Sequence, residues 1–173
     1  KGDYFERLVK AWLQNAPTQK DQFSRVLTFA EWAGERREDK RDTGIDLYAQ
    51  LADDPDSWCA IQCKFYAAGY KLQKADIDSF FTASGKRPFT RRIIVDTTDA
   101  AWSEHAETAL NDQIVPTIRI GLNDLEESGI DWDLFAAEGI VRLEPKKKIR
   151  DDQREALDAV IEGLAEADRG KLI

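Results

Sequence analysis

Residues 92–96, with the sequence RIIVD, form a short apolar run between two charged residues. Such a run is typical of a strand that is buried on both faces in the centre of a sheet. A strand of this kind needs a layer of helices on each side, and the rest of the chain alternates between helical and strand patterns. The run therefore constrains the chain to an α/β domain.

The spacing of apolar residues predicts the remaining elements. We expect helices at 3–14, 73–83 and 100–110, strands at 22–32, 45–51, 58–66 and 116–120, and a helical turn at 122–125. Residues 53–56 (DDPD) mark a turn, so the strands on either side should pair as a hairpin. The order α-β-β-β-α-β-α-β predicts a three-layer α/β/α sandwich with a mixed central sheet.

The composition changes near the end of the chain. Residues 144–150 (EPKKKIR) have the character of a linker, 151–167 form an amphipathic helical pattern, and 170–173 have the start of a strand pattern. A helix and an interrupted strand do not form a domain of their own. We therefore expect one domain at 1–143 and the truncated start of a second domain at 151–173, which makes this chain the front part of a longer protein.

Several classes of protein are excluded by residue counts. Two Cys and one His cannot build a tetrahedral Cys/His zinc site. His105 falls on the polar side of an expected helix, so we interpret it as a surface residue rather than a catalytic base. The sequence has no membrane-spanning run and no signal-peptide pattern at its start, which predicts a cytoplasmic protein with no membrane partner.

The charge is unevenly distributed. The chain has a net charge of −8, but residues 61–92 hold seven cations and two anions. A basic segment in an acidic protein can bind a polyanion. We predict DNA contacts by Lys86, Arg87, Arg91 and Arg92; a plain solvated loop and helix face is an equally good interpretation of the charge alone.

One group of polar residues has the chemistry of a metal site. Asp46 enters the first strand of the expected hairpin, and Gln62 and Lys64 end the second strand. Side chains alternate along a strand, so Gln62 and Lys64 share a face, and pairing would bring Asp46 beside them. With the backbone carbonyl of Cys63, the two side-chain oxygens suit Mg²⁺, which could activate a water molecule. Lys64 could orient that water and offset charge on a phosphate.

These residues resemble the PD-(D/E)xK nuclease superfamily, and more closely its Mrr-like restriction endonucleases, whose motif is D…QxK. Residues 2–6 (GDYFE) are similar to the first helix of that branch, which implies that Glu6 is an accessory acid. The resemblance covers residues 1–120 and implies a restriction-endonuclease-like fold that cleaves double-stranded DNA with Mg²⁺. Gln62 replaces the acid of the wider superfamily, which leaves the number of metal ions open.

The C-terminal segment carries a second resemblance. Residues 149–157 (IRDDQREAL) look like the Q motif of superfamily 2 helicases, which implies that Gln153 contacts the adenine of ATP. The phosphate-binding loop that such enzymes need is absent, so ATP would bind only in the full-length protein. An ordinary amphipathic helix is the alternative interpretation.

A nuclease followed by the start of a helicase resembles type ISP restriction-modification enzymes and, next, type I restriction subunits. The resemblance implies downstream helicase and methyltransferase domains as partners in the same polypeptide. We therefore expect a Mg²⁺-dependent endonuclease that serves as the cleavage module of an ATP-dependent restriction-modification enzyme. The alternatives are a catalytically degenerate nuclease fold that holds DNA or docks the motor, and a structure-specific resolvase with the same core.

Overall fold

The sheet determines the architecture of this protein, whose computed structural model describes residues 2–36, 44–111, 113–145 and 151–166. Its five strands lie in sequence order: β1 (Phe23–Thr28), β2 (Leu47–Leu51), β3 (Trp58–Lys64), β4 (Phe89–Asp96) and β5 (Thr117–Ile120). The pairs β1–β2 and β2–β3 are antiparallel, whereas β3–β4 and β4–β5 are parallel. The expected hairpin and the expected mixed sheet are both confirmed.

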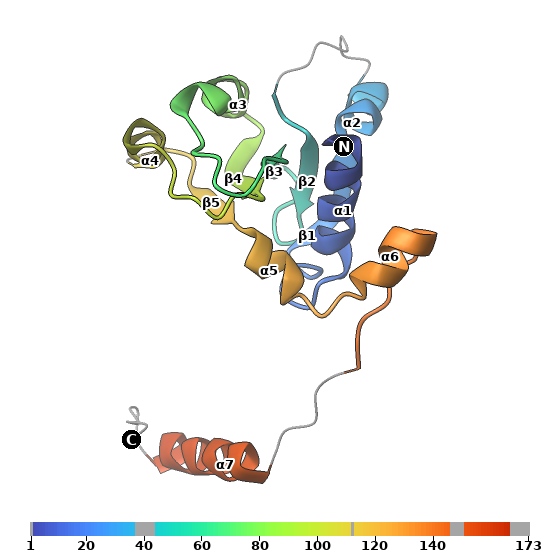
Figure 1. Ribbon diagram of the computed structural model, residues 1–173, viewed down its shortest axis with the longest axis vertical. Helices are drawn as coiled ribbons and strands as arrows, with labels where there is room; N and C mark the ends of the chain where they lie inside the picture. Colours follow the sequence, from blue (N-terminus) through green and yellow to red (C-terminus); the bar gives the residue numbers. More distant parts are fainter. Residues whose placement is uncertain (1, 37–43, 112, 146–150, 167–173) are drawn as a thin grey trace.

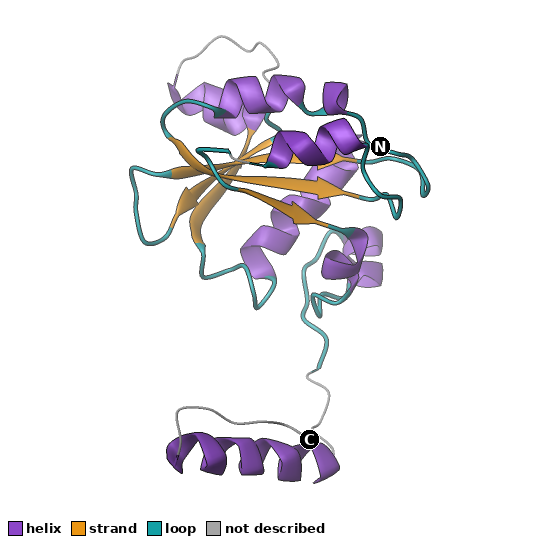
Figure 2. Ribbon diagram, turned by 90° about the vertical axis from the view of Figure 1, so that its left-hand side faces the viewer, coloured by secondary structure: helices purple, strands orange, loops and turns teal. Residues whose placement is uncertain are grey.

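Helices lie on both sides of this sheet (Figures 1 and 2). The elements are α1 (Gly2–Asn15), α2 (Phe29–Arg36), the 3₁₀ helix η1 (Lys74–Asp76), α3 (Asp78–Ser84), α4 (Glu104–Leu110), α5 (Leu122–Glu126), α6 (Trp132–Glu138) and α7 (Asp151–Glu166). Figure 1 shows α1 on one side of the sheet and α3 and α4 on the other. The predicted three-layer α/β/α arrangement is therefore confirmed.

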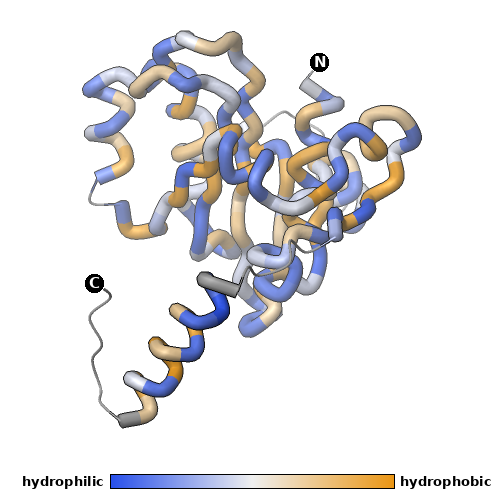
Figure 3. Tube along the Cα trace, turned by 60° about the horizontal axis from the view of Figure 1, so that its bottom comes forward, coloured by the Kyte–Doolittle hydropathy of each residue, from blue (hydrophilic) through white to orange (hydrophobic). Residues whose placement is uncertain are grey.

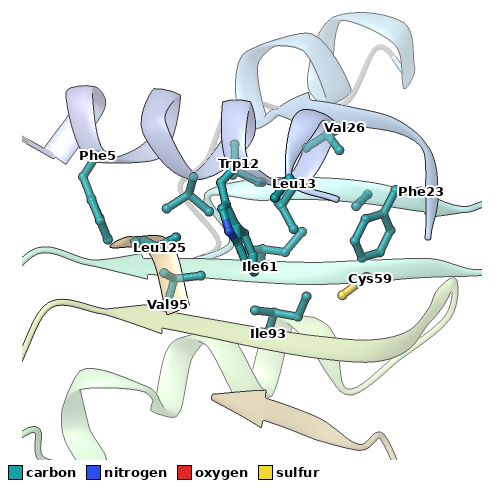
Figure 4. Close-up of a cluster of buried hydrophobic side chains, with 14 of the residues drawn as sticks. Phe5, Trp12, Leu13, Phe23, Val26, Cys59, Ile61, Ile93, Val95 and Leu125 are labelled. Atoms are coloured by element: carbon teal, nitrogen blue, oxygen red, sulfur yellow. The ribbon is translucent and has the colours of Figure 1, made fainter. Parts of the chain in front are cut away.

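Side chains of α1 form the core on one face of the sheet. Phe5, Trp12 and Leu13 point toward the strands, where they meet Ile61 and Val95 (Figure 4). All five side chains are buried. Apolar residues along α1 recur at helical spacing, so burial of this one face holds the helix against the sheet.

Aromatic side chains dominate the opposite face. The rings of Trp32 and Tyr48 stack with centroids 4.5 Å apart, and Trp58 meets Trp32 edge-on at 4.4 Å. Phe80 of α3 and Ile94 of β4 are fully buried in the same cluster. The centre of the run RIIVD is apolar because Ile93 and Val95 point into one core and Ile94 into the other.

The sequence predicts one long strand at 22–32, but the structure has β1 followed by α2. Thr28 and Glu31 form a capping box that starts the helix. The N–H of Thr28 donates to Glu31 Oε2 at 2.7 Å, and the N–H of Glu31 donates to Thr28 Oγ1 at 3.3 Å. This T-x-x-E pattern is a signal for a helix start, and it outweighs the β-branched and aromatic composition around it.

Other elements also differ from the expected ones. The helix expected at 73–83 is divided into η1 and α3, and β4 begins at Phe89 rather than Arg92. The helix α6 was not among the expected elements. Asp131 caps its start by accepting from the N–H of Leu134 at 2.9 Å, and Gly139 ends it with a φ of 71°. Both residue types are common at these positions.

The C-terminal helix α7 lies apart from the sheet in Figure 1, and Figure 3 shows polar and apolar positions alternating along it. Its apolar side chains Leu157, Ile161 and Leu164 are exposed. Most of the expected linker at 144–150 lies outside the described residues, and the expected strand at 170–173 lies wholly outside them. None of the described helices is long and apolar enough to cross a membrane.

Arg92 corrects a sequence-based prediction. The sequence places it with the DNA-binding cations, but the structure buries it to 3% exposure. Its guanidinium donates to Ser84 Oγ at 2.7 Å and to the carbonyl of Val115 at 3.1 Å, and it lies over the ring of Phe81. Burial lowers the pKa of Arg92. In this fold Arg92 joins α3 to the segment before β5 and is not available to a phosphate.

We expect Arg92→Met to lower the free energy of unfolding by about 3 kcal/mol, because several buried acceptors lose their donor at once. The neighbouring Arg91→Met is the matched control. Arg91 is 40% exposed and 3.8 Å from Asp53, so its loss should cost no more than about 0.5 kcal/mol. Urea unfolding of the two variants measures this; equal losses would contradict a structural role that is specific to Arg92.

Glu31 provides a test at low pH. A hydrogen bond from the Lys10 ammonium, followed by one from the Thr28 N–H, lowers the pKa of Glu31 from 4.5 to about 2. Because the pKa of Glu31 is lower in the folded state, its carboxylate stabilises the fold at pH values above 4.5. This contribution to the free energy of unfolding is lost as the pH falls toward 2. Because Glu31 is half exposed, we expect Glu31→Gln to cost only about 1 kcal/mol at neutral pH. Urea unfolding should show the difference disappearing near pH 2; a constant difference would contradict the assignment.

Candidate functional site

Asp46 lies directly before β2, where the sheet register places it beside the end of β3. Leu47 pairs with Ile61, and the N–H of Asp46 donates to the carbonyl of Ile61 at 3.0 Å. The Asp46 carboxylate in turn accepts from the N–H of Cys63 at 2.6 Å. The acid is therefore fixed to the strand that carries Gln62 and Lys64, as the hairpin prediction requires.

Gln62 is only 2% exposed, and one hydrogen bond determines the orientation of its amide. Its Nε2 donates to the carbonyl of Gly44 at 3.0 Å. Because a carbonyl can only accept, the other amide atom must be the oxygen. Gln62 Oε1 is buried and has no hydrogen-bond partner among the residues that the structure describes. A buried oxygen that keeps no donor costs about 1–3 kcal/mol.

Gly44 positions this amide through two constraints. It has a φ of 76°, a conformation that L side chains rarely adopt. A Cβ at this position would also lie 2.7 Å from Ser79 Oγ and 3.2 Å from the N of Phe80. Gly44 thus brings its carbonyl toward Gln62 while its Cα packs closely against α3.

Glu6 approaches the same edge of the sheet from α1. The pKa of the Cys63 thiol responds to the charges of these groups. Burial raises it most, the negative charges of Asp46 and Glu6 raise it further, and the positive charge of Lys64 lowers it. Side-chain alternation places Cys63 on the α1 face of β3 and Gln62 on the α3 face. The predicted catalytic residues therefore gather at one edge, with Glu6 on the α1 side.

Lys64 ends β3 and is half-buried. Its carbonyl accepts from the N–H of Thr97 at 3.2 Å, which anchors the strand end to the segment after β4. Its charge also acts on Asp76, whose carboxylate accepts from the hydroxyl groups of Tyr66 and Tyr70. Burial raises the Asp76 pKa, but the N–H of Gln73 and these hydroxyls outweigh it, and the net shift is downward.

The donor set differs from that of a carboxylate-rich metal site. Among the residues described, no three His, Cys, Asp or Glu side chains gather closely enough to hold a metal ion. The oxygen donors that the sequence predicts here are the Asp46 carboxylate, the Gln62 amide oxygen and the Cys63 carbonyl, with Glu6 on the α1 side. These are hard oxygen ligands of the kind that Mg²⁺ prefers, so the donors fit the ion that the sequence predicts.

The predicted DNA-binding cations lie at the other end of the sheet. Lys86 and Arg87 are exposed in the loop before β4, and the N–H of Trp58 donates to the carbonyl of Pro88 at 3.0 Å. This contact places the loop beside the start of β3, whereas Lys64 ends that strand. The length of β3 separates the two groups by about 20 Å at about 3.3 Å per residue. The basic segment is therefore not one continuous surface.

Gln153 is exposed on α7. The phosphate-binding part of a nucleotide site is absent from the sequence, so its predicted contact with adenine stays a prediction.

Comparison with known proteins gives one family match. Residues 14–139 match the Mrr_cat_2 family, described as restriction endonuclease. This range contains Asp46, Gln62 and Lys64 and excludes Glu6. No curated protein matches the chain.

The solved structures include a similar enzyme of much greater length. The ATP-dependent type ISP restriction-modification enzyme LlaBIII bound to DNA is 33% identical, with a TM-score of 0.74 over 99% of this chain. This chain spans 11% of that enzyme. The predicted likeness to Mrr-like nucleases and to type ISP enzymes is confirmed.

Two other solved structures are more distant. The protein of unknown function AF1548 is 16% identical with a TM-score of 0.49, and the match covers 79% of each chain. The MspJI restriction endonuclease in complex with a 27-mer oligonucleotide is 14% identical with a TM-score of 0.41, and the match covers 71% of this chain and 27% of that one.

Gly44→Ala tests how the site is positioned. Besides the strain of a positive φ, the new Cβ must displace Ser79 or the backbone of α3, so we expect a loss of about 2–3 kcal/mol in the free energy of unfolding. Gly129→Ala is the matched control: its φ is 72°, and no described atom lies within 4 Å of a Cβ built there. It should lose only about 1 kcal/mol. Equal losses by urea unfolding would show that the contact with α3 is unimportant.

Proposed function

Because the chain belongs to the Mrr_cat_2 restriction endonuclease family, we propose that it is a metal-dependent endonuclease domain that hydrolyses phosphodiester bonds in DNA. We further propose that it is the cleavage module of an ATP-dependent restriction-modification enzyme. The 33% identity to a type ISP enzyme supports this wider role.

The buried oxygen of Gln62, which has no hydrogen-bond partner in the described part of the chain, is the observation that carries the proposal. Gln62 is the neighbour of Cys63 on β3, and the N–H of Cys63 fixes the Asp46 carboxylate. A protein that uses this edge only for folding gains nothing from a buried amide oxygen without a donor. A cation bound by Asp46 and Gln62 would satisfy that oxygen.

Each residue has a proposed role. Asp46, Gln62 and the carbonyl of Cys63 would hold Mg²⁺, which supplies Lewis-acid stabilisation and an acidified water when bound. Lys64 would orient the attacking water and offset negative charge at the scissile phosphate. Glu6, on the α1 side, would act as an accessory acid. With a single carboxylate among the direct side-chain ligands, we expect weak Mg²⁺ binding in the absence of DNA.

Contacts with the duplex would come from both ends of the sheet. We propose that Lys86, Arg87 and Arg91 bind phosphates of double-stranded DNA. They lie about 20 Å from Lys64, which corresponds to about six base-pair steps at about 3.4 Å each. Phosphates bound there would be separate from the one that is cleaved, so these cations would contribute to affinity rather than to the chemical step.

The remaining parts of the proposed enzyme lie outside this chain. We propose helicase and methyltransferase domains in the same polypeptide, with residues 1–143 as the nuclease and 151–173 leading into the helicase. Gln153 would contact the adenine of ATP only when that helicase is present. Among the described residues no three His, Cys, Asp or Glu side chains gather to hold a metal ion, which favours one second candidate, a nuclease fold that holds DNA without cleaving it.

Asp46→Asn tests the proposed chemistry. It keeps an oxygen that can accept from Cys63 N–H but removes the charge that holds the metal, so Mg²⁺-dependent nicking of supercoiled plasmid should fall by about 100-fold or more. Mg²⁺ binding by calorimetry should weaken in parallel. Asp53→Asn is the control, because Asp53 is exposed in the β2–β3 turn.

The outcomes separate the two candidate functions. Nicking that survives in Asp46→Asn would overturn the site assignment. If the unsubstituted chain binds DNA but shows neither Mg²⁺ binding nor nicking, the DNA-holding role is supported instead. Circular dichroism of the variant would confirm that it is folded.

A further inference from the structure

We propose that the loop after β3, residues 65–71, is a preformed surface that binds the DNA strand beside the scissile phosphate, with Phe65 as its main contact. This inference rests on the proposed nuclease function and adds a residue that contacts the substrate. We call residues 65–71 the aromatic loop, since they contain Phe65, Tyr66 and Tyr70.

The aromatic loop begins at the proposed catalytic site. Phe65 directly follows Lys64, so their Cα atoms are about 3.8 Å apart. Phe65 is 51% exposed, and its ring lies 5.6 Å from that of Phe5 on α1. Tyr70 is 37% exposed and bonds to Asp76. The loop thus presents aromatic side chains on both sides of the strand end that carries Lys64.

Hydrogen bonds hold this exposed loop in place. The N–H of Tyr66 donates to Thr97 Oγ1 at 2.9 Å, and that hydroxyl donates to the carbonyl of Tyr66 at 2.7 Å. Thr98 Oγ1 donates to the carbonyl of Tyr70 at 2.6 Å. An exposed aromatic side chain on a fixed backbone loses little conformational entropy when it binds a partner. These contacts favour a binding surface over an unconstrained loop.

Two cations of the loop region can meet a phosphate backbone. Lys71 is exposed, and Lys64 lies at the start of the loop. The nearby carboxylates are engaged with the loop itself: Asp99 accepts from the N–H of Gly69 at 2.6 Å, and Asp76 accepts from two tyrosine hydroxyls. These hydrogen bonds fix the carboxylates, which keep their negative charge, so Lys64 and Lys71 are the groups of the loop that can meet a phosphate backbone.

The shape beside Phe65 favours a flat apolar group. Phe65 forms part of the wall of a groove of about 240 Å³. The other lining residues are Phe5, Leu8, Thr97, Leu122, Leu125, Glu126 and Trp132. A single DNA strand combines an anionic backbone with apolar base and sugar faces, and bases stack on aromatic side chains in many nucleic-acid-binding proteins. The strand next to the cleaved bond matches both properties of this surface.

The test measures DNA binding with EDTA present, so that cleavage cannot interfere. We expect Phe65→Ala to weaken binding of labelled single-stranded DNA by about tenfold in fluorescence anisotropy, and Phe65→Trp to restore it. The salt dependence should keep its slope, because no cation is removed, whereas Lys71→Ala should reduce that slope by about one. Ile118→Ala is the matched control, since Ile118 is 50% exposed on β5.

Three results would overturn the inference: unchanged affinity in a folded Phe65→Ala variant, an equal loss in Ile118→Ala, or no DNA binding by the chain at low salt. Failure of the proposed function gives a different result. In that case the Asp46→Asn variant still cleaves DNA, and this result does not depend on how tightly the Phe65→Ala variant binds DNA. If Phe65→Ala binds normally while Asp46→Asn loses cleavage, the nuclease proposal stands and only the role of the aromatic loop fails.

Discussion

The hydrogen bond from the N–H of Cys63 to the Asp46 carboxylate is the contact on which the candidate site depends. It joins the residue before β2 to the end of β3 at 2.6 Å, beyond the last pair of the regular ladder. The same strand end carries Gln62 and Lys64, so the sheet itself brings the acid, the amide and the ammonium to one edge. Both faces of that sheet are covered by helices, which makes the position of the edge a consequence of core packing (Figure 4).

Gln62 shows how function and stability oppose each other here. Gly44 fixes the amide so that its nitrogen is satisfied and its oxygen is not. The fold tolerates a buried acceptor without a donor, at a cost of about 1–3 kcal/mol, at the position where the proposed nuclease would hold its cation. Gly44, two residues before Asp46, has a positive φ that other residues rarely adopt, and this conformation directs its carbonyl to the Gln62 amide. A left-handed glycine and an acceptor without a donor among the described residues thus lie together at the proposed site.

The sequence was sufficient to predict the hairpin, the mixed sheet and the position of Asp46 next to the end of β3, because a strand period of two and a short turn determine that register. It did not reveal the burial of Arg92, since the partners Ser84 and Val115 come together only in the folded chain. The separation of Lys86 from Lys64 was missed for a similar reason: β3 and β4 are parallel, so the loop before β4 lies at the start of β3. For α2 the local signal was present in Thr28 and Glu31, but the aromatic composition around them favoured a strand.

The most direct test of the central claim is to locate a metal ion in crystals grown with Mn²⁺, using anomalous diffraction. The account predicts a single strong peak at the edge of the sheet, with an Asp46 carboxylate oxygen and Gln62 Oε1 both among its ligands. A peak at other residues, or an Asp46 carboxylate and a Gln62 oxygen that bind no ion at saturating Mn²⁺ with DNA present, would contradict it.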